Sequence, residues 1–122
     1  MKDIEKRKAL FIAHGAKLKG AEVYFREDWD CYYYSLNGKC FGMLGDEIIT
    51  LKGNPQDNEV MRETYKDVIP GYYANKIHWN SIYLTTEELT NEDIFKMIDI
   101  SYELVLKKMT KKEQKAILEK TS

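Results

Sequence analysis

The chain has 122 residues, of which 43% are hydrophobic, and a formal net charge of −1 at pH 7. This length predicts a single domain over residues 1–122, with a core large enough to fold without disulfides or metals. The sequence contains no run of about 18 apolar residues that could cross a membrane. Its charged start also lacks the apolar core of a signal peptide. We therefore expect a cytoplasmic protein with no membrane partner.

The first part of the chain predicts one helix followed by strands. Apolar residues recur every seven positions at Ile4, Phe11 and Leu18, which favours a helix over residues 3–18, ended by Gly20. A short strand is expected over residues 21–25. Asn37-Gly38 is a strong hairpin signal and predicts paired strands over residues 31–36 and 39–44.

The register of this hairpin decides which side chains share a face of the sheet. A two-residue turn pairs Tyr34 with Phe41 and Tyr32 with Met43, and leaves Tyr33 pointing outward. The next strand, residues 47–52, brings Ile49 and Leu51 to the same face only if the loop over residues 45–47 has odd length. We therefore predict a three-residue loop. The expected helix-packed face comprises Tyr34, Phe41, Met43, Ile49 and Leu51.

The second part of the chain predicts three helices around one or two strands. Asn54-Pro55 is a helix start, and a helix to about Tyr65 would turn Val60 and Met61 inward. Residues 71–84 predict the fourth and fifth strands or one long bent strand. Thr90 and Thr110 each open a capping-box-like helix. The first of these carries a long apolar stripe of Ile94, Ile98, Ser101, Val105 and Met109, widened by Phe95 and Tyr102, and the second is a short terminal helix over Ala116, Ile117 and Leu118.

These elements predict an α+β fold in two layers. The expected order is α-β(3)-α-β(1-2)-α-α, with a single antiparallel sheet of four to five strands. The helices are expected on one face of that sheet, because few parallel crossovers are possible in this order.

Charge is distributed unevenly along the chain. Residues 1–20 contain six bases and two acids, and residues 105–122 contain the same numbers, whereas the middle is acidic. If the terminal helices lie side by side, they form one basic face; otherwise they are two solvated helix surfaces. The candidate basic contacts to nucleic acid are Lys6, Arg7, Lys8, Lys107, Lys108, Lys111 and Lys112.

The segment from Pro70 to Tyr83 combines aromatic rings with polar groups. If it is a strand, Lys76 and His78 lie on one face and Trp79 on the other. In one reading Asn75, Lys76 and His78 contact phosphates, and Trp79 stacks on bases with Tyr83. In the other, the polar residues form an ordinary strand face, Asn75 caps a turn and the rings belong to the core. Trp29 beside an outward Tyr33 could form another binding patch.

Catalysis and cofactors find little support in the sequence. Cys31 and Cys40 lie far apart along the predicted hairpin, beyond disulfide reach, and are expected to be free thiols. They are too few for a zinc site without histidine. No local motif joins either thiol to His78 as a nucleophile and base, and no phosphate-binding or dinucleotide-binding motif is present. We expect a protein that is not an enzyme and that has no cofactor and no metal.

Several segments, in this order and spacing, resemble the MmcQ/YjbR family. They cover about residues 18–110 and read G-A-E-V-Y-F at 20–25, N-G-K-C-F-G at 37–42, L-K-G-N-P at 51–55, V-I-P-G-Y-Y-A-N-K-I-H-W-N-S-I-Y at 68–83 and I-D-I-S-Y at 98–102. Ala74 departs from the methionine that the family often has before Asn-Lys. This departure bears only on local packing.

The resemblance implies a CyaY-like, or frataxin-like, α+β fold and the family's label of predicted DNA-binding proteins. Iron binding fits poorly, because frataxins place acidic residues on a first helix that is basic here. The leading expectation is a small non-catalytic module that binds DNA through the basic helix face and the Asn75–Trp79 strand. The alternative is a chaperone-like module that binds a protein partner through an exposed Tyr/Trp sheet face.

Overall fold

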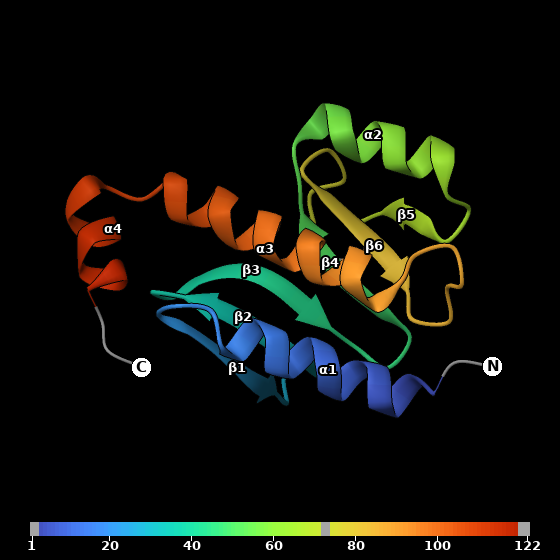
Figure 1. Cartoon of the computed structure of the whole chain (residues 1–122), viewed down its shortest axis with the longest axis horizontal. Helices are drawn as coiled ribbons and strands as arrows, with labels where there is room; N and C mark the ends of the chain where they lie inside the picture. The colour runs from blue at the N-terminus through green and yellow to red at the C-terminus, as the bar shows by residue number, and fades with distance from the viewer. Residues whose placement is uncertain (1–2, 72–73, 120–122) are drawn as a thin grey trace.

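The computed structural model describes residues 3–71 and 74–119, which form one sheet and four helices (Figure 1). Tyr72 and Tyr73, which fall in the strand region predicted over residues 71–84, lie outside the described residues. The elements in chain order are α1 (Ile4–Ala16), β1 (Ala21–Arg26), β2 (Cys31–Leu36), β3 (Lys39–Leu44), β4 (Ile48–Lys52), α2 (Pro55–Thr64), β5 (Val68–Pro70), β6 (Trp79–Tyr83), α3 (Asn91–Lys107) and α4 (Lys111–Leu118).

The six strands form an open antiparallel sheet in the order β1-β2-β3-β4-β6-β5. The predicted α+β class and single antiparallel sheet are confirmed. The predicted count and order are wrong in detail, because the sheet has six strands and four of them precede α2. Those four match the strand ranges predicted there, so the predicted order counted one strand too few. The extra strand at the end of the sheet, β5, has only three residues, too few for a recognisable alternating pattern.

Helix starts follow local capping signals. Asn54 Oδ1 accepts the Gln56 N–H at 3.0 Å, and Pro55 occupies the first turn of α2. Both α3 and α4 begin with complete capping boxes, Thr90 with Asp93 and Thr110 with Glu113. Each box satisfies N–H groups that a helix end leaves without partners, which explains why these starts are predictable from sequence.

The first hairpin contains a β-bulge that the sequence did not predict. Tyr34 pairs with Gly42 and Ser35 pairs with Cys40, so that Phe41 is an extra residue without a partner on β2. The predicted pairs of Tyr34 with Phe41 and Tyr32 with Met43 are therefore wrong. After the bulge, the residues of β3 that were expected to point inward point outward, and their neighbours point inward. Leu44 therefore has the inward position expected for Met43.

The turn between β3 and β4 compensates for the bulge. Three residues separate the two strand ranges, but the predicted odd-length loop is wrong, because Leu44 pairs with Ile49 and the Gly45 N–H donates to the Ile48 carbonyl at 2.9 Å. This is the register of a two-residue turn. Ile49 and Leu51 point inward as expected, although the even turn acts together with the bulge instead of an odd loop.

The helices lie on one face of the sheet, as predicted. α1 packs on β1 and β2, and α3 packs on β2, β3 and β4 and against α1. α2 packs on β5 and β6, where Asn80, on the same face as its neighbour Leu51, donates to the Asn58 carbonyl at 3.1 Å. We call this side the helix face. Its core includes Phe11, Tyr34, Phe41, Ile49, Ile82, Ile94 and Ile98.

The expected inward residues of the helices are mostly confirmed. The α3 stripe Ile94, Ile98, Ser101 and Val105 is buried, as is Met109 just beyond the helix. Met61 packs against the core, but Val60 is 58% exposed, so that the inward prediction for Val60 is wrong. In α4 only Ile117 is buried among the three apolar residues expected to pack.

Candidate ligand-binding site on the open face of the sheet

The opposite side of the sheet, here called the open face, carries one row of side chains across all six strands. Pairing aligns Tyr24, Tyr33, Met43, Thr50, Ser81 and Ile69 in successive strands. No helix of the described residues packs on this row. Tyr33 therefore points outward as predicted. Tyr24 is 45% exposed and Tyr33, Met43 and Ile69 are half-buried, whereas Thr50 and Ser81 at the centre of the row are buried.

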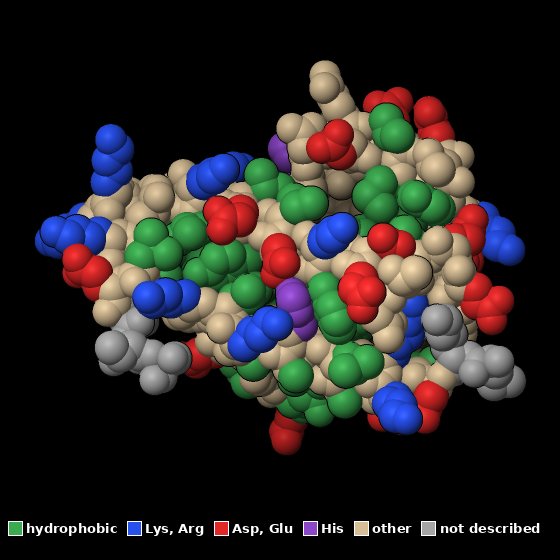
Figure 2. All heavy atoms as spheres, viewed as in Figure 1, with side chains coloured by type: hydrophobic (Ala, Val, Ile, Leu, Met, Phe, Trp, Pro, Cys, Tyr) green, Lys and Arg blue, Asp and Glu red, His purple; other side chains and the backbone are tan. Residues whose placement is uncertain are grey.

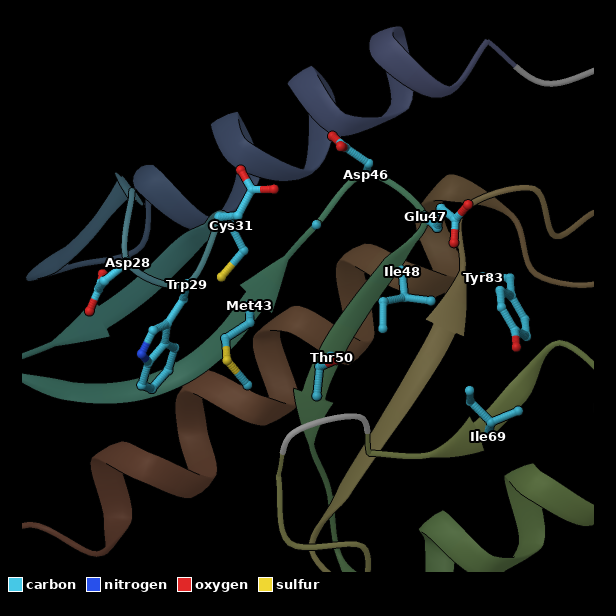
Figure 3. A pocket seen from close by; sticks show the side chains of 12 residues that line it. Asp28, Trp29, Cys31, Met43, Asp46, Glu47, Ile48, Thr50, Ile69 and Tyr83 are labelled. Carbon is cyan, nitrogen blue, oxygen red and sulfur yellow. The ribbon is translucent and has the colours of Figure 1, made fainter.

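A groove of about 960 Å³ occupies this face (Figure 3). Its lining comes from five strands and two turns and comprises Asp28, Trp29, Asp30, Cys31, Met43, Gly45, Asp46, Glu47, Ile48, Thr50, Ile69 and Tyr83. Trp29 and Met43 lie on one side and Tyr83 and Ile69 on the other, with Thr50 between them (Figure 3). The volume is within the range of pockets that hold small ligands or a few residues of a peptide.

Trp29, which lines the groove, belongs to a packed aromatic cluster. The rings of Trp29 and Tyr33 lie 5.8 Å apart and those of Tyr24 and Tyr33 5.7 Å apart. The Arg26 guanidinium lies 4.3 Å from the centre of the Trp29 ring. Trp29 nevertheless remains 52% exposed. The predicted patch of Trp29 beside Tyr33 is therefore present, and it presents a large ring in a defined position.

Carboxylates form the rim of the groove. Asp28 pairs with Arg26 at 2.6 Å and Asp46 with Lys8 at 2.9 Å, and in each case the cation lowers the pKa of the carboxyl group. The side chains of Asp30 and Glu47 take part in no ion pair within the described part of the chain. The rim therefore carries negative charge that is only partly balanced by its own neighbours.

The segment predicted to contact nucleic acid is a turn, not a strand, before β6. Asn75 Oδ1 accepts the N–H groups of Ile77 and His78 at 2.9 and 3.2 Å, and its carbonyl accepts the Trp79 N–H at 2.9 Å. Asn75 therefore caps a turn, which was the alternative interpretation. The prediction that Lys76 and His78 share one strand face is wrong, because a chain bonded to itself in this way cannot be extended.

Lys76 and the backbone of His78 are also held by hydrogen bonds, one within the segment and one to Gly53 outside it. Lys76 Nζ lies 3.3 Å from the Gly71 carbonyl, and His78 accepts the Gly53 N–H through its backbone oxygen at 2.9 Å. Trp79 is half-buried and pairs with Lys52 across β4 and β6. The structure does not place this segment together with the terminal helices in one basic surface.

Two of the predicted basic contacts are structural. The buried Arg7 guanidinium donates to the carbonyls of Leu84, Thr86 and Leu89 at 2.7, 2.9 and 2.8 Å. Its Nε also donates to Asn91 at 2.7 Å. Lys8 is buried beside Asp46. The prediction that these residues are exposed for phosphate is therefore wrong, because their donors already have partners inside the fold.

The remaining basic residues lie at opposite ends of the molecule. α1 begins at one end, where Lys6 is exposed, and α4 lies at the other end, beyond α3 (Figure 1). Lys and Arg side chains gather around α4 (Figure 2). The predicted contacts at this end, Lys107, Lys108, Lys111 and Lys112, are all exposed, and so is Lys115. Lys6 therefore does not share a face with these lysines, although Gly20, just beyond α1, packs against Ile117 of α4.

Metal and redox sites are not apparent on the described residues. Over residues 3–71 and 74–119, no group of three or more His, Cys, Asp or Glu side chains is arranged to hold a metal ion. Cys31 and Cys40 are free, as predicted. No helix in the same ranges is long and apolar enough to span a membrane.

Comparison with known proteins places the chain in a family. The YjbR family model matches residues 16–104. The chain is 26% identical over 104 residues to Escherichia coli K12 "Uncharacterized protein YjbR", covering 82% of this chain and 87% of that one. It is 34% identical over 89 residues to "Uncharacterized protein YbdF" of Escherichia coli O157:H7, covering 69% and 71%.

Two solved structures share the fold. A Deinococcus radiodurans protein, DR2400, described as a DUF419 domain, aligns with a TM-score of 0.76 at 24% identity and covers 86% of this chain and 83% of its own. A Pseudomonas syringae protein aligns with a TM-score of 0.66 at 23% identity, covering 80% and 97%. Together with the motifs in residues 18–110, the matched family model shows that this chain belongs to the YjbR family.

Proposed function

We propose that this protein is a non-catalytic binding module whose open sheet face holds a peptide segment of a partner protein. The segment carries basic and apolar side chains. The observation that supports this proposal is the groove of about 960 Å³, with aromatic and aliphatic walls and a rim of Asp28, Asp30, Asp46 and Glu47.

The residue types of the groove suit peptide recognition. Tryptophan and tyrosine supply large contact area at small entropic cost and are common among residues that dominate binding energy. Tyr83 and Trp29 stand on opposite sides of the groove (Figure 3), so that an apolar side chain could enter between them. A partner with lysine or arginine complements the carboxylate rim, and such complementarity raises association rate and specificity.

The state of the cysteines supports a non-catalytic role. A nucleophilic cysteine needs a lowered pKa, because the thiolate is the reactive form. Burial raises the pKa of both Cys31 and Cys40. Cys31, the thiol that lines the groove, is therefore a protonated, weakly reactive side chain near neutral pH.

The test is a titration with designed peptides. A ten-residue peptide alternating Lys with Leu or Trp is compared with its twin carrying Glu in place of Lys. We expect saturable binding of the basic peptide, at least about tenfold weaker binding of the acidic one, and about tenfold loss in Tyr83→Ala. Ile100→Ala is the matched control, because Ile100 is also an exposed apolar side chain but lies on α3, outside the groove. Equal binding of both peptides, or equal loss in both variants, would remove the groove as the site.

Nucleic-acid binding is a second candidate, supported by the lysines around α4. Lys107, Lys108, Lys111 and Lys112 could meet several backbone phosphates. With three to five phosphate contacts, log K should fall with log salt with a slope of roughly −3 to −4.5 on duplex DNA. Lys76→Ala should weaken binding equally for all sequences and lower the slope by about one if Lys76 takes part. Absence of binding to duplex and single strands at about 20 mM salt would eliminate this candidate.

A further inference from the structure

The sheet opens into a cleft where β3 and β4 separate. These strands pair only from Gly42 with Leu51 to Leu44 with Ile49. Beyond that point β3 continues along β2, and β4 continues along β6. The bulged Phe41 marks the separation, since its carbonyl has turned away from β4.

A serine from α3 closes the inner end of this opening. The buried Ser101 hydroxyl donates to the Phe41 carbonyl and accepts the Lys52 N–H at 2.9 Å. Ser101 thus replaces the direct bond that the two strands would otherwise make, and it satisfies backbone groups that would be costly to leave unpaired. The cleft is a built feature of the fold and not a frayed strand end.

Lysines converge on this cleft. It has a volume of about 320 Å³ and is lined by Lys39, Cys40, Lys52, Val105 and Lys108. Burial, and to a smaller extent the neighbouring ammonium of Lys108, lowers the pKa of Lys52, as expected when a cation is partly desolvated beside a like charge. No carboxylate acts on Lys52 among the described residues, where only the Cys40 thiol opposes this effect. Lys39 differs in having an acidic neighbour, Glu113. Hydrogen bonds to Thr110 lower the pKa of Glu113, and the charge of Lys39 adds to this effect.

We propose that the β3–β4 cleft is a binding site for a phosphate-type oxyanion. Lys52 and Lys108 hold the anion from the two sides of the opening, and Lys39 lies at its entrance. Two neighbouring ammonium groups without a carboxylate repel one another, and a multivalent anion between them removes this repulsion and accepts charge-assisted hydrogen bonds. This site is separate from the groove on the open face and does not depend on its function.

Geometry and charge favour a phosphate over a larger acidic group. Three lysines around 320 Å³ match a compact anion with several acceptor oxygens, whereas a peptide carboxylate would satisfy only part of these donors. Phosphate can be free, part of a small monoester or part of a nucleic-acid backbone. The chemistry is the same in each case, and the experiment separates these sources.

The experiment is a titration of the protein with inorganic phosphate at constant ionic strength, followed by calorimetry. We expect saturable binding that Lys52→Gln or Lys108→Gln weakens about tenfold, the value of one charged hydrogen bond. Lys115→Gln removes the same charge from an exposed site on α4 and should change affinity less than about twofold. Without phosphate, Lys52→Gln should not lower the melting temperature, because it relieves repulsion.

The cysteines give a second readout. Cys40 lines the cleft, whereas Cys31 lies at the other end of β2–β3 and lines the groove. Phosphate should slow alkylation of Cys40 by neutral iodoacetamide and leave Cys31 unchanged. Slowing of both thiols, or of neither, would contradict an anion seated in the cleft.

Phenyl phosphate and a short single-stranded oligonucleotide identify the source. If Lys52→Gln weakens oligonucleotide binding as much as phosphate binding, the site takes backbone phosphates. If it weakens phosphate and phenyl phosphate only, the site takes a free or monoester phosphate. Absence of any phosphate binding up to about 20 mM, above the range of weak millimolar sites, would overturn the proposal, as would equal losses in Lys52→Gln and Lys115→Gln.

Discussion

The two faces of the sheet contain similar aromatic residues in opposite environments. On the helix face Tyr34 and Phe41 are fully buried, while on the open face Tyr24 and Trp29 remain 45% and 52% exposed. The difference arises from strand parity and helix coverage, since hydrophobicity alone would place all four inside. Aromatic content therefore does not identify a core strand, whereas the face on which each ring lies separates packing from recognition.

The largest expected effect tests which face each side chain of β3 occupies. Phe41→Ala should lower the free energy of unfolding by about 3–5 kcal/mol, because it leaves a cavity between Tyr34 and Tyr102. Met43→Ala, on the open face, should lower it by about 1 kcal/mol or less. Urea unfolding of both variants measures the contrast. Equal losses, or a loss below about 1 kcal/mol for Phe41→Ala, would show that the bulge is misplaced.

A second contrast separates a structural base from a surface base on one helix. Arg7→Met should cost about 2–4 kcal/mol, because it leaves buried carbonyls at Leu84, Thr86 and Leu89 without their donor. Lys6→Met changes an exposed neighbour and should stay within about 0.5 kcal/mol. Chemical unfolding gives both values. If the two variants lose the same stability, Arg7 is not the link between α1 and residues 84–89.

Local signals explain why much of the fold is predictable from sequence. Asn37-Gly38 fixes the hairpin turn, and Thr90 and Thr110 fix two helix starts through contacts three residues away. These interactions lie within a few residues of one another, so that the sequence displays both partners. The family motifs further supplied the α+β class, which the antiparallel sheet confirms.

Most of the errors involve partners distant in sequence; one exception is the turn at Asn75, whose bonds to Ile77 and His78 are local. The bulge at Phe41 is held by Ser101, sixty positions later, and it reversed the parity expected for Met43. In the sequence Arg7 resembles a surface base. In the structure the carbonyls of the β6–α3 connection surround its guanidinium. Most of the groove was missed for the same reason, because Met43 and Tyr83 join it only in the true register. Gly42 could have indicated the true pairing of β2 with β3. A side chain at this position would press against the Tyr34 side chain.

A smaller effect on stability is expected from two tyrosine hydroxyls on the helix face. Tyr34 is buried, and its hydroxyl has no hydrogen-bond partner among the described residues, whereas the Tyr102 hydroxyl donates to the Lys19 carbonyl at 2.6 Å. Tyr34→Phe should therefore raise the free energy of unfolding by about 1 kcal/mol, and Tyr102→Phe should lower it by about 1 kcal/mol. The denaturant midpoints of the two variants at pH 7 show whether each substitution raises or lowers stability. Loss of stability in Tyr34→Phe would indicate a partner for that hydroxyl.

The same comparison predicts the alkaline pH dependence. Burial raises the pKa of Tyr34 above the ordinary value of 10.0, and raises that of Tyr33 to about 12. The folded state therefore holds these protons more tightly than the unfolded chain. Their stabilising contribution is complete below pH 10 and is lost as the pH rises above it. Unfolding measured at about pH 8 and about pH 11 should show this loss, and Tyr34→Phe should reduce it.

The smallest expected stability effect belongs to the open face. Trp29→Ala removes the contacts with Arg26 and Tyr33, and exposed contacts of this kind contribute about 0.5–1 kcal/mol. The free energy of unfolding should therefore fall by no more than about 1 kcal/mol, while affinity for the basic, apolar peptide falls at least about tenfold. Ile100→Ala should change neither quantity by a comparable amount, because this exposed side chain lies outside the groove. A large stability loss in Trp29→Ala with unchanged peptide affinity would assign the aromatic cluster to packing, and the two faces of the sheet would then differ in exposure but not in role.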